Sequence, residues 1–343
     1  MMACIQSRLR WTRLSTTRLT QPSIPRAYRR HISTLNSSAA SLDIPGHTVT
    51  LPSGRLLGYH TSGPTTGTPV LYIHGHPDSG LTITGQLETR AAERLGIRWI
   101  GPDRPGVGLS TPYDAQTVLD YPSDIRSLVE HLGLKSYYIL GTSGGTGFAL
   151  ACAKDLPRSQ VGAVGICAGV GPYECGFDSM VEPQRKALEA WRDYPAEFKA
   201  YYESEYVPLA RQNDIAALAD RIRGEFEAGF SGADREVLLE ENAFAAAVKT
   251  LRQAWVQGAW AHAKGMELHW RPWGFALEDV AFPGVRLWYA SRDGSTTPVM
   301  GRFMADRLPR SVYKEFPGDS HFTIWRDGNL QEMLRDLLGA GDP

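Results

Sequence analysis

The sequence predicts an α/β protein with a mostly parallel sheet and helices on both faces of that sheet. Short runs rich in Val and Ile alternate with amphipathic helical patterns over residues 69–169, and this alternation returns at residue 285. Parallel strands are buried on both faces and are therefore apolar throughout. Between the two parts, from residue 174 to about residue 280, helical patterns follow one another without strands. We therefore expect one sheet domain that carries a helical insertion.

The first 40 residues differ in composition from the rest of the chain. They contain seven arginines and no acidic residue, and without them the formal net charge changes from −1 to −8. An acid-free segment rich in Arg, Ser and Thr is typical of a mitochondrial presequence. We predict that residues 1–40 direct the protein to mitochondria, and Arg-Arg-His-Ile-Ser (29–33) offers a cleavage site after Ile32. The alternative is a disordered basic tail on a cytoplasmic protein.

The first predicted elements form a hairpin that leads into the alternating region. Residues 47–63 read as a strand, a Pro-Ser-Gly turn and a second strand, which indicates an antiparallel pair. The apolar run at 69–75 predicts the next strand. A helical pattern at 87–97 and another strand at 98–103 follow.

The next helix is predicted over residues 120–134. Asp120 is its candidate N-cap, and Ile125, Leu128 and Val129 share one face. A strand at 136–141, an alanine-rich helix after Ser143 and a strand at 161–169 complete the first part of the predicted sheet.

The helical insertion sets the predicted domain boundaries. We assign residues 45–173 and 281–340 to the sheet core and residues 174–280 to a cap. The cap patterns lie at 183–206, 214–230 and 242–263. After the cap, the sequence predicts a strand at 285–291, a helix at 299–309, a strand at 311–316 and a helix at 329–339.

Ser143 is the candidate nucleophile. It lies in Gly-Thr-Ser-Gly-Gly (141–145), which matches the G-x-S-x-G pattern of a sharp strand-to-helix turn. The helix N-terminus that follows directs backbone N–H groups and a positive dipole at the site. The alternative is a glycine-rich turn or phosphate loop, but the chain has no G-x-x-x-x-G-K pattern at this position.

His321 and Asp293 are the candidate base and the acid that orients it. His321 lies in a Gly/Asp/Ser loop after the last predicted strand, and Asp293 in a polar loop after the strand before it. A serine hydroxyl needs such a base, and the order Ser…Asp…His is the one that nucleophile-elbow enzymes use. Glu174 and Asp178 are the alternative acids. We interpret Asp103 as a residue that fixes its loop beside Arg104.

The turn at residues 74–77, His-Gly-His-Pro, is the candidate oxyanion site. It follows a predicted strand, so the backbone N–H of His76 can pair with that of Gly144 as the two donors. His74 is interpreted as structural. The His74-x-His76 spacing suggests a metal pair, but no carboxylate–histidine set with zinc spacing accompanies it. We predict neither a metal ion nor another cofactor.

Taken together, these motifs resemble the α/β-hydrolase fold superfamily, in particular serine hydrolases of the AB hydrolase-1 type. The resemblance covers about residues 47–337 and includes the stretch 103–110, Asp-Arg-Pro-Gly-Val-Gly-Leu-Ser. It implies an eight-stranded, mostly parallel sheet with helices on both faces and an inserted helical cap. "SGGTGFALACA" and "RPWGFALEDV" resemble one generic subgroup. Thr146-Gly147 departs from that subgroup's usual Gly-Pro, and "DGSTTP" carries one extra residue before its proline.

A serine nucleophile indicates acyl transfer, whereas an aspartate at that position would indicate epoxide or haloalkane chemistry. We predict hydrolysis of a small carboxylic ester through an acyl-enzyme. The alternatives are an aminopeptidase, thioesterase, acyltransferase or C–C lyase, or a non-catalytic binding protein, because one fold hosts many functions. Aromatic residues in the cap favour an apolar or aromatic acyl or alcohol group, and the alternative for each of them is that it packs the cap helices together. They are Trp191, Trp255, Trp260, Trp270, Trp273, Phe226, Phe230 and Phe244.

The composition also excludes some partners. An acidic body argues against nucleic acid as the main partner. No run of apolar residues approaches the length of a membrane span. The cysteines Cys4, Cys152, Cys167 and Cys175 show no metal or disulfide spacing, so we expect buried thiols.

Overall fold

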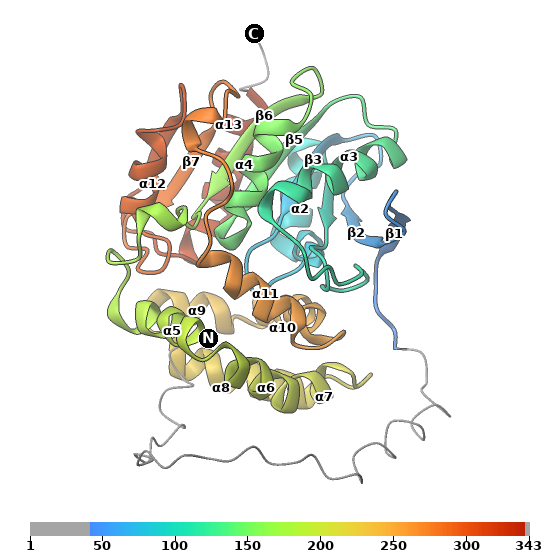
Figure 1. Ribbon diagram of the computed structural model, residues 1–343, viewed down its shortest axis with the longest axis vertical. Helices are drawn as coiled ribbons and strands as arrows, with labels where there is room; N and C mark the ends of the chain where they lie inside the picture. The colour runs from blue at the N-terminus through green and yellow to red at the C-terminus, as the bar shows by residue number, and fades with distance from the viewer. Residues whose placement is uncertain (1–41, 340–343) are drawn as a thin grey trace.

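The computed structural model describes residues 42–339 (Figure 1). The predicted presequence, residues 1–40, and Cys4 lie outside the described residues. None of the helices within 42–339 is long and apolar enough to cross a membrane.

A single sheet of eight strands organises the fold, in the order β1-β2-β4-β3-β5-β6-β7-β8. β2 pairs antiparallel with β1 and with β4, and the remaining pairs are parallel. This confirms the predicted mostly parallel sheet. In chain order the strands are β1 (His47–Thr50), β2 (Leu56–Ser62), β3 (Thr68–Ile73), β4 (Ile97–Pro102), β5 (Tyr137–Thr142), β6 (Val161–Cys167), β7 (Arg286–Ala290) and β8 (Val312–Phe316).

Helices cover both faces of this sheet, as predicted. Successive residues of a strand point to opposite faces. Leu71 and Ile73 of β3 accordingly belong to an apolar cluster with α3, α4 and α12, whereas Val70 and Tyr72 belong to another with α2 and α13. These helices are α2 (Gln86–Leu95), α3 (Tyr121–His131), α4 (Thr146–Asp155), α12 (Pro298–Ala305) and α13 (Asp327–Gly339).

The predicted N-cap of α3 differs in one detail. Asp120 does occupy the N-cap position, but its side chain accepts no hydrogen bond from an N–H of α3. Its carboxylate accepts instead from the backbone N–H and the hydroxyl of Thr117, at 2.7 and 2.8 Å. A short 3-10 turn, η3 (Val118–Asp120), precedes α3, and the carboxylate belongs to the capping box of that turn.

Residues 174–280, which we call the helical insert, lie between β6 and β7 in the chain. In Figure 1 the helices of the insert stack together below the sheet. The insert has an apolar core of its own, in which Tyr202, Tyr206 and Trp255 are fully buried. Its helices are α5 (Glu182–Asp193), α6 (Pro195–Glu205), α7 (Val207–Ala210), α8 (Ala216–Gly229), α9 (Gly232–Leu239), α10 (Glu241–Trp255) and α11 (Trp260–His269).

Two glycines allow the loop after β3 to lie directly against β4. A Cβ on Gly101 of β4 would lie 2.2 Å from the carbonyl oxygen of Gly80, the first residue of the 3-10 turn η2 (Gly80–Thr84). We therefore expect Gly101→Ala to lower the free energy of unfolding by about 1–3 kcal/mol, because the backbone must move to admit the methyl group. Urea denaturation would measure the loss.

The matched control for this substitution is Gly224→Ala. Gly224 lies inside α8, and nothing lies within 4 Å of the position of an added Cβ. Alanine at an exposed helix position is expected to stabilise by about 0.5–1 kcal/mol. Equal unfolding free energies for Gly101→Ala and the wild-type protein would contradict the close approach described above.

Candidate active site

Ser143 lies at a sharp turn between β5 and α4. Its φ is 46°, in the left-handed region that a residue with a side chain rarely adopts, at a cost of about 1–3 kcal/mol. The carbonyl of Ser143 accepts hydrogen bonds from the Thr146 hydroxyl at 2.7 Å and from the N–H of Val170 at 3.1 Å. These two bonds hold the strained turn. Thr146 stands where the resembled subgroup usually has glycine, and its hydroxyl helps to hold Ser143 in position.

The glycines around Ser143 provide space for close packing, as the G-x-S-x-G pattern predicts. A Cβ on Gly145 would lie 2.4 Å from the carbonyl oxygen of Ile73, and a Cβ on Gly141 would lie 2.5 Å from the Cβ of Ala149. At this turn, β5 and α4 therefore pack closely against each other and against the end of β3. Any larger residue at these positions would displace the serine.

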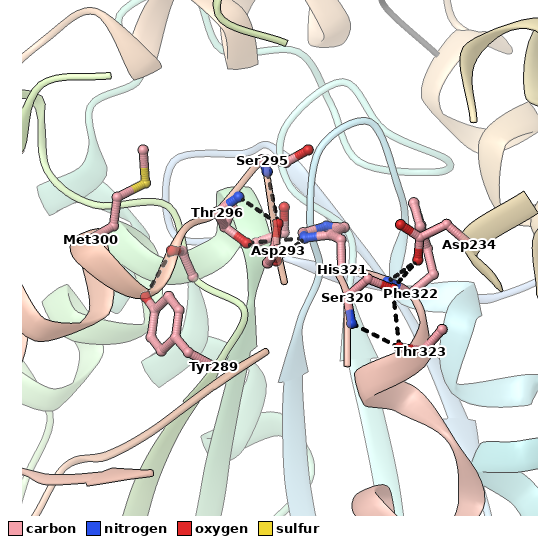
Figure 2. A network of polar contacts seen from close by, with 12 residues as sticks. Asp234, Tyr289, Asp293, Ser295, Thr296, Met300, Ser320, His321, Phe322 and Thr323 are labelled. Atoms are coloured by element: carbon pink, nitrogen blue, oxygen red, sulfur yellow. Dashed lines mark hydrogen bonds and ion pairs between the residues drawn. The ribbon is translucent and has the colours of Figure 1, made fainter. Parts of the chain in front are cut away.

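His321 and Asp293 meet at the carboxyl ends of β8 and β7. The Nδ1–H of His321 donates to Oδ2 of Asp293 at 2.7 Å (Figure 2). Asp293 is buried, with 4% of its surface exposed. The predicted pair is therefore formed, with the carboxylate on the far side of the imidazole from its Nε2.

The charges at this pair affect both pKa values. Burial acts to raise the pKa of Asp293, but the charge and hydrogen bond of His321 outweigh burial and lower it. Burial acts to lower the pKa of His321, but Asp293, with a further contribution from Asp234, outweighs burial and raises it. An imidazole with a raised pKa is a stronger base while it is neutral.

The loop that carries Asp293 fixes its carboxylate. The N–H groups of Ser295 and Thr296 donate to Oδ1 at 2.8 and 2.9 Å, and the Thr296 hydroxyl donates to Oδ2 at 2.7 Å. The Thr296 oxygen also lies 3.0 Å from Nδ1 of His321. The loop Asp-Gly-Ser-Thr-Thr-Pro (293–298) is one residue longer than the pattern of the resembled subgroup. Three donors of this loop orient the Asp293 carboxylate. Thr296 was not a predicted site residue.

The alternative acids lie elsewhere. Glu174 and Asp178 are exposed, and neither forms a hydrogen bond or ion pair with His321.

Asp103 is fully buried and joins two segments. It accepts from the N–H of Gly80 at 2.8 Å and contacts Nε2 of His60 at 3.1 Å. It therefore fixes its loop as predicted, although its side-chain partners are Gly80 and His60, not the neighbouring Arg104.

His74 joins the loop after β3 to the loop after β4. Its Nδ1–H donates to the carbonyl of Gly75 at 2.9 Å, and its Nε2 accepts from the N–H of Arg104 at 3.1 Å. The Arg104 side chain donates to the same Gly75 carbonyl at 2.5 Å. Both side chains hold the turn that carries His76.

The two residues of the predicted oxyanion site lie against each other. A Cβ on Gly144 would be 2.8 Å from the Cβ of His76. The His76 ring packs against His262 and His269, at centroid distances of 4.9 and 5.7 Å. Burial lowers the pKa of His262 to about 3 and that of His269 to about 4. These rings are therefore neutral at pH 7.

His269 is a further polar group beside Gly144 that the sequence did not predict. Its Nδ1–H donates to the Gly265 carbonyl at 2.7 Å, which leaves Nε2 as an acceptor. This Nε2 would lie 3.3 Å from a Cβ on Gly144. The ring lines the same cavity as Ser143, so a substrate in that cavity meets an acceptor close to the serine.

Within the part of the chain that the structure describes, no cluster of three or more His, Cys, Asp or Glu side chains is arranged to hold a metal ion.

A cavity of about 590 Å³ joins the sheet and the helical insert at this site. Ser143, His76 and His321 line its sheet side. The insert supplies mainly apolar residues, which are Phe177, Met180, Leu188, Phe226, Phe230, Val237, Leu238, Leu251 and Met266. Ser143 lines this cavity, and its hydroxyl makes no hydrogen bond with a described residue.

The aromatic residues of the insert divide between the cavity wall and the packing of its helices. Phe226 and Phe230 line the cavity, but the tryptophans and Phe244 do not. Trp191 and Trp255 are buried in the core of the insert, and Trp273 packs on Gly147, where a Cβ would lie 2.8 Å from its ring. The large flat tryptophan rings therefore fill the space between helices, and the apolar wall of the cavity is formed by aliphatic, methionine and phenylalanine side chains.

Two carboxyl groups also line the cavity. Burial raises the pKa of Asp78 to about 6 and that of Glu88 to about 7. Asp78 accepts from the N–H of Ser79 at 2.8 Å and from the hydroxyl of Thr82 at 2.7 Å. A cation beside these groups would restore their ionised form. The sequence alone did not point to either residue.

The predicted cysteine burial holds in part. Cys152 and Cys167 are buried free thiols, whereas Cys175 is half-buried. None of the three is paired in a disulfide.

Known proteins are similar to this chain over different extents. It is 32% identical to a proline iminopeptidase of Arabidopsis thaliana over 111 residues, which are 32% of this chain and 28% of that protein. It is 29% identical to a non-heme chloroperoxidase of Streptomyces lividans over 169 residues, 47% of this chain and 58% of that one. The matches thus span between about a quarter and three fifths of these curated relatives.

Solved structures resemble the chain over most of its length. A bromoperoxidase from Bacillus anthracis gives a TM-score of 0.61 at 20% identity, covering 86% of this chain and 100% of that one. A thermophilic esterase from Thermogutta terrifontis gives 0.60 at 21% identity, covering 87% and 100%. Likeness at this identity concerns the fold.

The family model described as alpha/beta hydrolase fold matches residues 68–327. That range contains Ser143, Asp293 and His321, and it includes the helical insert. It agrees with the resemblance that the sequence motifs indicated and with the eight-stranded sheet. The chain belongs to the alpha/beta hydrolase fold family.

Proposed function

We propose that the protein is a serine hydrolase that cleaves a small carboxylic ester through Ser143, His321 and Asp293. The observation that carries the proposal is the contact between His321 and Asp293, at 2.7 Å, beside the cavity that Ser143 lines from its strained turn. A serine on a strained turn that faces a cavity, with a carboxylate-oriented histidine, is the arrangement that acyl transfer requires.

In the proposed reaction, the Ser143 oxygen attacks the ester carbonyl while Nε2 of His321 takes the hydroxyl proton. The backbone N–H groups of His76 and Gly144 receive the charge that develops on the carbonyl oxygen. Collapse of this intermediate breaks the bond to the alcohol, which leaves with the proton from His321. Water then attacks the acyl-enzyme by the same route and releases the acid.

The lining of the cavity supports an apolar substrate. The insert contributes aliphatic, methionine and phenylalanine side chains, and the charged groups along the wall are mainly carboxylates, with Arg326 as a cation. Such a wall suits an uncharged acyl or alcohol group better than a phosphate.

The experiment has two parts. Incubation of the full chain with a fluorophosphonate is expected to label Ser143, which peptide mass spectrometry identifies. A panel of 4-nitrophenyl esters of increasing acyl length is then expected to show hydrolysis with an optimum set by the cavity. Absence of both labelling and hydrolysis would overturn the proposal.

A second candidate function is that of an aminopeptidase. Asp78, Glu88 and Nε2 of His269 are acceptors on the cavity wall, and together they suit an ammonium group. The sequence relatives include proteins named proline iminopeptidase. Hydrolysis of aminoacyl 4-nitroanilides in preference to the esters, with a loss of that activity in Glu88→Gln, would favour this candidate.

A further inference from the structure

The loop that carries His321 is attached to the helical insert by a charged group. Oδ1 of Asp234, in α9, accepts a hydrogen bond from the hydroxyl of Ser320 and another from the N–H of Phe322 at 3.2 Å. Ser320 and Phe322 are the two sequence neighbours of His321. Figure 2 shows Asp234 directed at both of them, on the other side of the imidazole from Asp293.

The hydrogen bonds around Ser320 form one directed chain. The Ser320 N–H donates to the Thr323 hydroxyl at 2.8 Å, and the two hydroxyl oxygens lie 3.0 Å apart. Because the Ser320 proton points to Asp234, the Thr323 hydroxyl donates to Ser320. A carboxylate at the end of such a chain strengthens each bond, since charge-assisted bonds are stronger than neutral ones.

Apolar contacts hold the same loop to the insert. The Phe322 ring packs edge-on against Phe230, at a centroid distance of 5.2 Å, and against His321, at 5.1 Å. Val237 and Leu238 of α9 line the substrate cavity. One helix therefore contributes to the cavity wall and also bonds to the residues on both sides of the proposed base.

We propose that Asp234 is a positioning residue for His321, so that the helical insert sets the orientation of the base as well as the shape of the cavity. This inference rests on the proposed function. Without the bonds to Asp234, the loop loses its hydrogen bonds to the insert and keeps those to the loop after β7, such as the His321–Asp293 bond, and the Phe322–Phe230 contact. His321 also loses a negative charge that favours its protonated form during the reaction.

The charged groups around His321 define the expected pH dependence. Asp293 reaches it from the loop after β7, and Asp234 acts from α9. On the loop of His321, the Asp319 carboxylate accepts a hydrogen bond from the Asn329 amide at 2.8 Å and forms an ion pair with Arg326 at 3.7 Å. Both Asp293 and Asp234 raise the pKa of His321. Activity requires the neutral base, so it is lost as the pH falls through this raised pKa.

The test compares four variants of the full chain, using the pH dependence of kcat/KM and of the rate of fluorophosphonate labelling. Asp234→Asn removes the charge, so the acidic limb of both profiles is expected to move to lower pH. Asp234→Ala also removes the bonds, and we expect kcat to fall by up to about 10²-fold with a smaller change in KM. Ser320→Ala keeps the charge, so kcat falls while the acidic limb stays in place.

Glu236→Gln is the matched control. Glu236 lies in the same helix, is exposed, and its side chain makes no hydrogen bond or ion pair with a described residue. The substitution Glu236→Gln removes one negative charge, as Asp234→Asn does, and is expected to leave the pH profiles of kcat/KM and of labelling unchanged. If Asp234→Ala does not fold, as thermal unfolding would show, Asp234→Asn and Ser320→Ala carry the test.

The two failures are distinguishable. If the wild-type protein is labelled at Ser143 but the Asp234 variants behave like Glu236→Gln, the positioning role is overturned and the proposed function stands. If the wild-type protein is neither labelled nor active, the proposed function fails, and the inference fails with it.

Discussion

Replacing Ser143 by alanine is expected to lower kcat by at least about 10⁴-fold for every ester that the wild-type protein hydrolyses. The alanine removes the only atom that the proposed mechanism uses to form the acyl-enzyme. The backbone N–H groups of His76 and Gly144 remain, so a small residual rate above that of water is expected. Stopped assays with 4-nitrophenyl esters at high enzyme concentration would measure this residual rate.

The control for this change is Ser136→Ala, which makes the same substitution on an exposed residue just before β5. It should retain the activity of the wild-type protein and its fluorophosphonate labelling. Labelling of Ser143→Ala at another residue, with esterase activity preserved, would mean that a different nucleophile operates in this cavity.

Replacing Asp293 by asparagine is expected to lower kcat by about 10⁴-fold. The size of Asn matches that of Asp, but its amide group can donate a hydrogen bond to Nδ1 of His321. The imidazole proton would then move to Nε2, which could no longer accept the proton of Ser143. The loss of the charge also removes the main group that raises the pKa of His321.

Glu174→Gln and Asp178→Asn are the matched controls, because these residues were the alternative acids. Both are exposed and are expected to keep full activity. Steady-state kinetics with one ester measures all three variants. A large loss in either control, with Asp293→Asn still active, would assign the orienting role to a residue other than Asp293.

The order of strands and helices could be predicted because apolar patterning reflects burial directly. The runs before Ser143, Asp293 and His321 are strands of one sheet, and their carboxyl ends meet at one edge. Motif spacing then placed the serine, the acid and the histidine. Thr146 and the lengthened loop after Asp293 appeared in the sequence only as departures from a familiar pattern. The structure gives each of them a hydrogen bond to the site.

The contribution of the insert could not be predicted in the same way. Asp234 lies 87 positions before His321 in the chain, and nothing in the local pattern links it to the Ser320 hydroxyl. The roles of the tryptophans depend on how the helices pack against one another, which hydrophobic periodicity does not specify. His269 and Glu88 likewise become site residues only through the shape of the cavity.

In the helical insert, the residues that pack its interior are largely different from those that line the cavity. The stacked rings of Trp191, Tyr202 and Trp255 form its interior, whereas side chains such as Val237 and Ala247 face the cavity. Substitutions of the residues that line the cavity can alter substrate preference without creating a void in the packed interior of the insert. The insert is therefore a suitable region for engineering selectivity, provided that Asp234 is left in place.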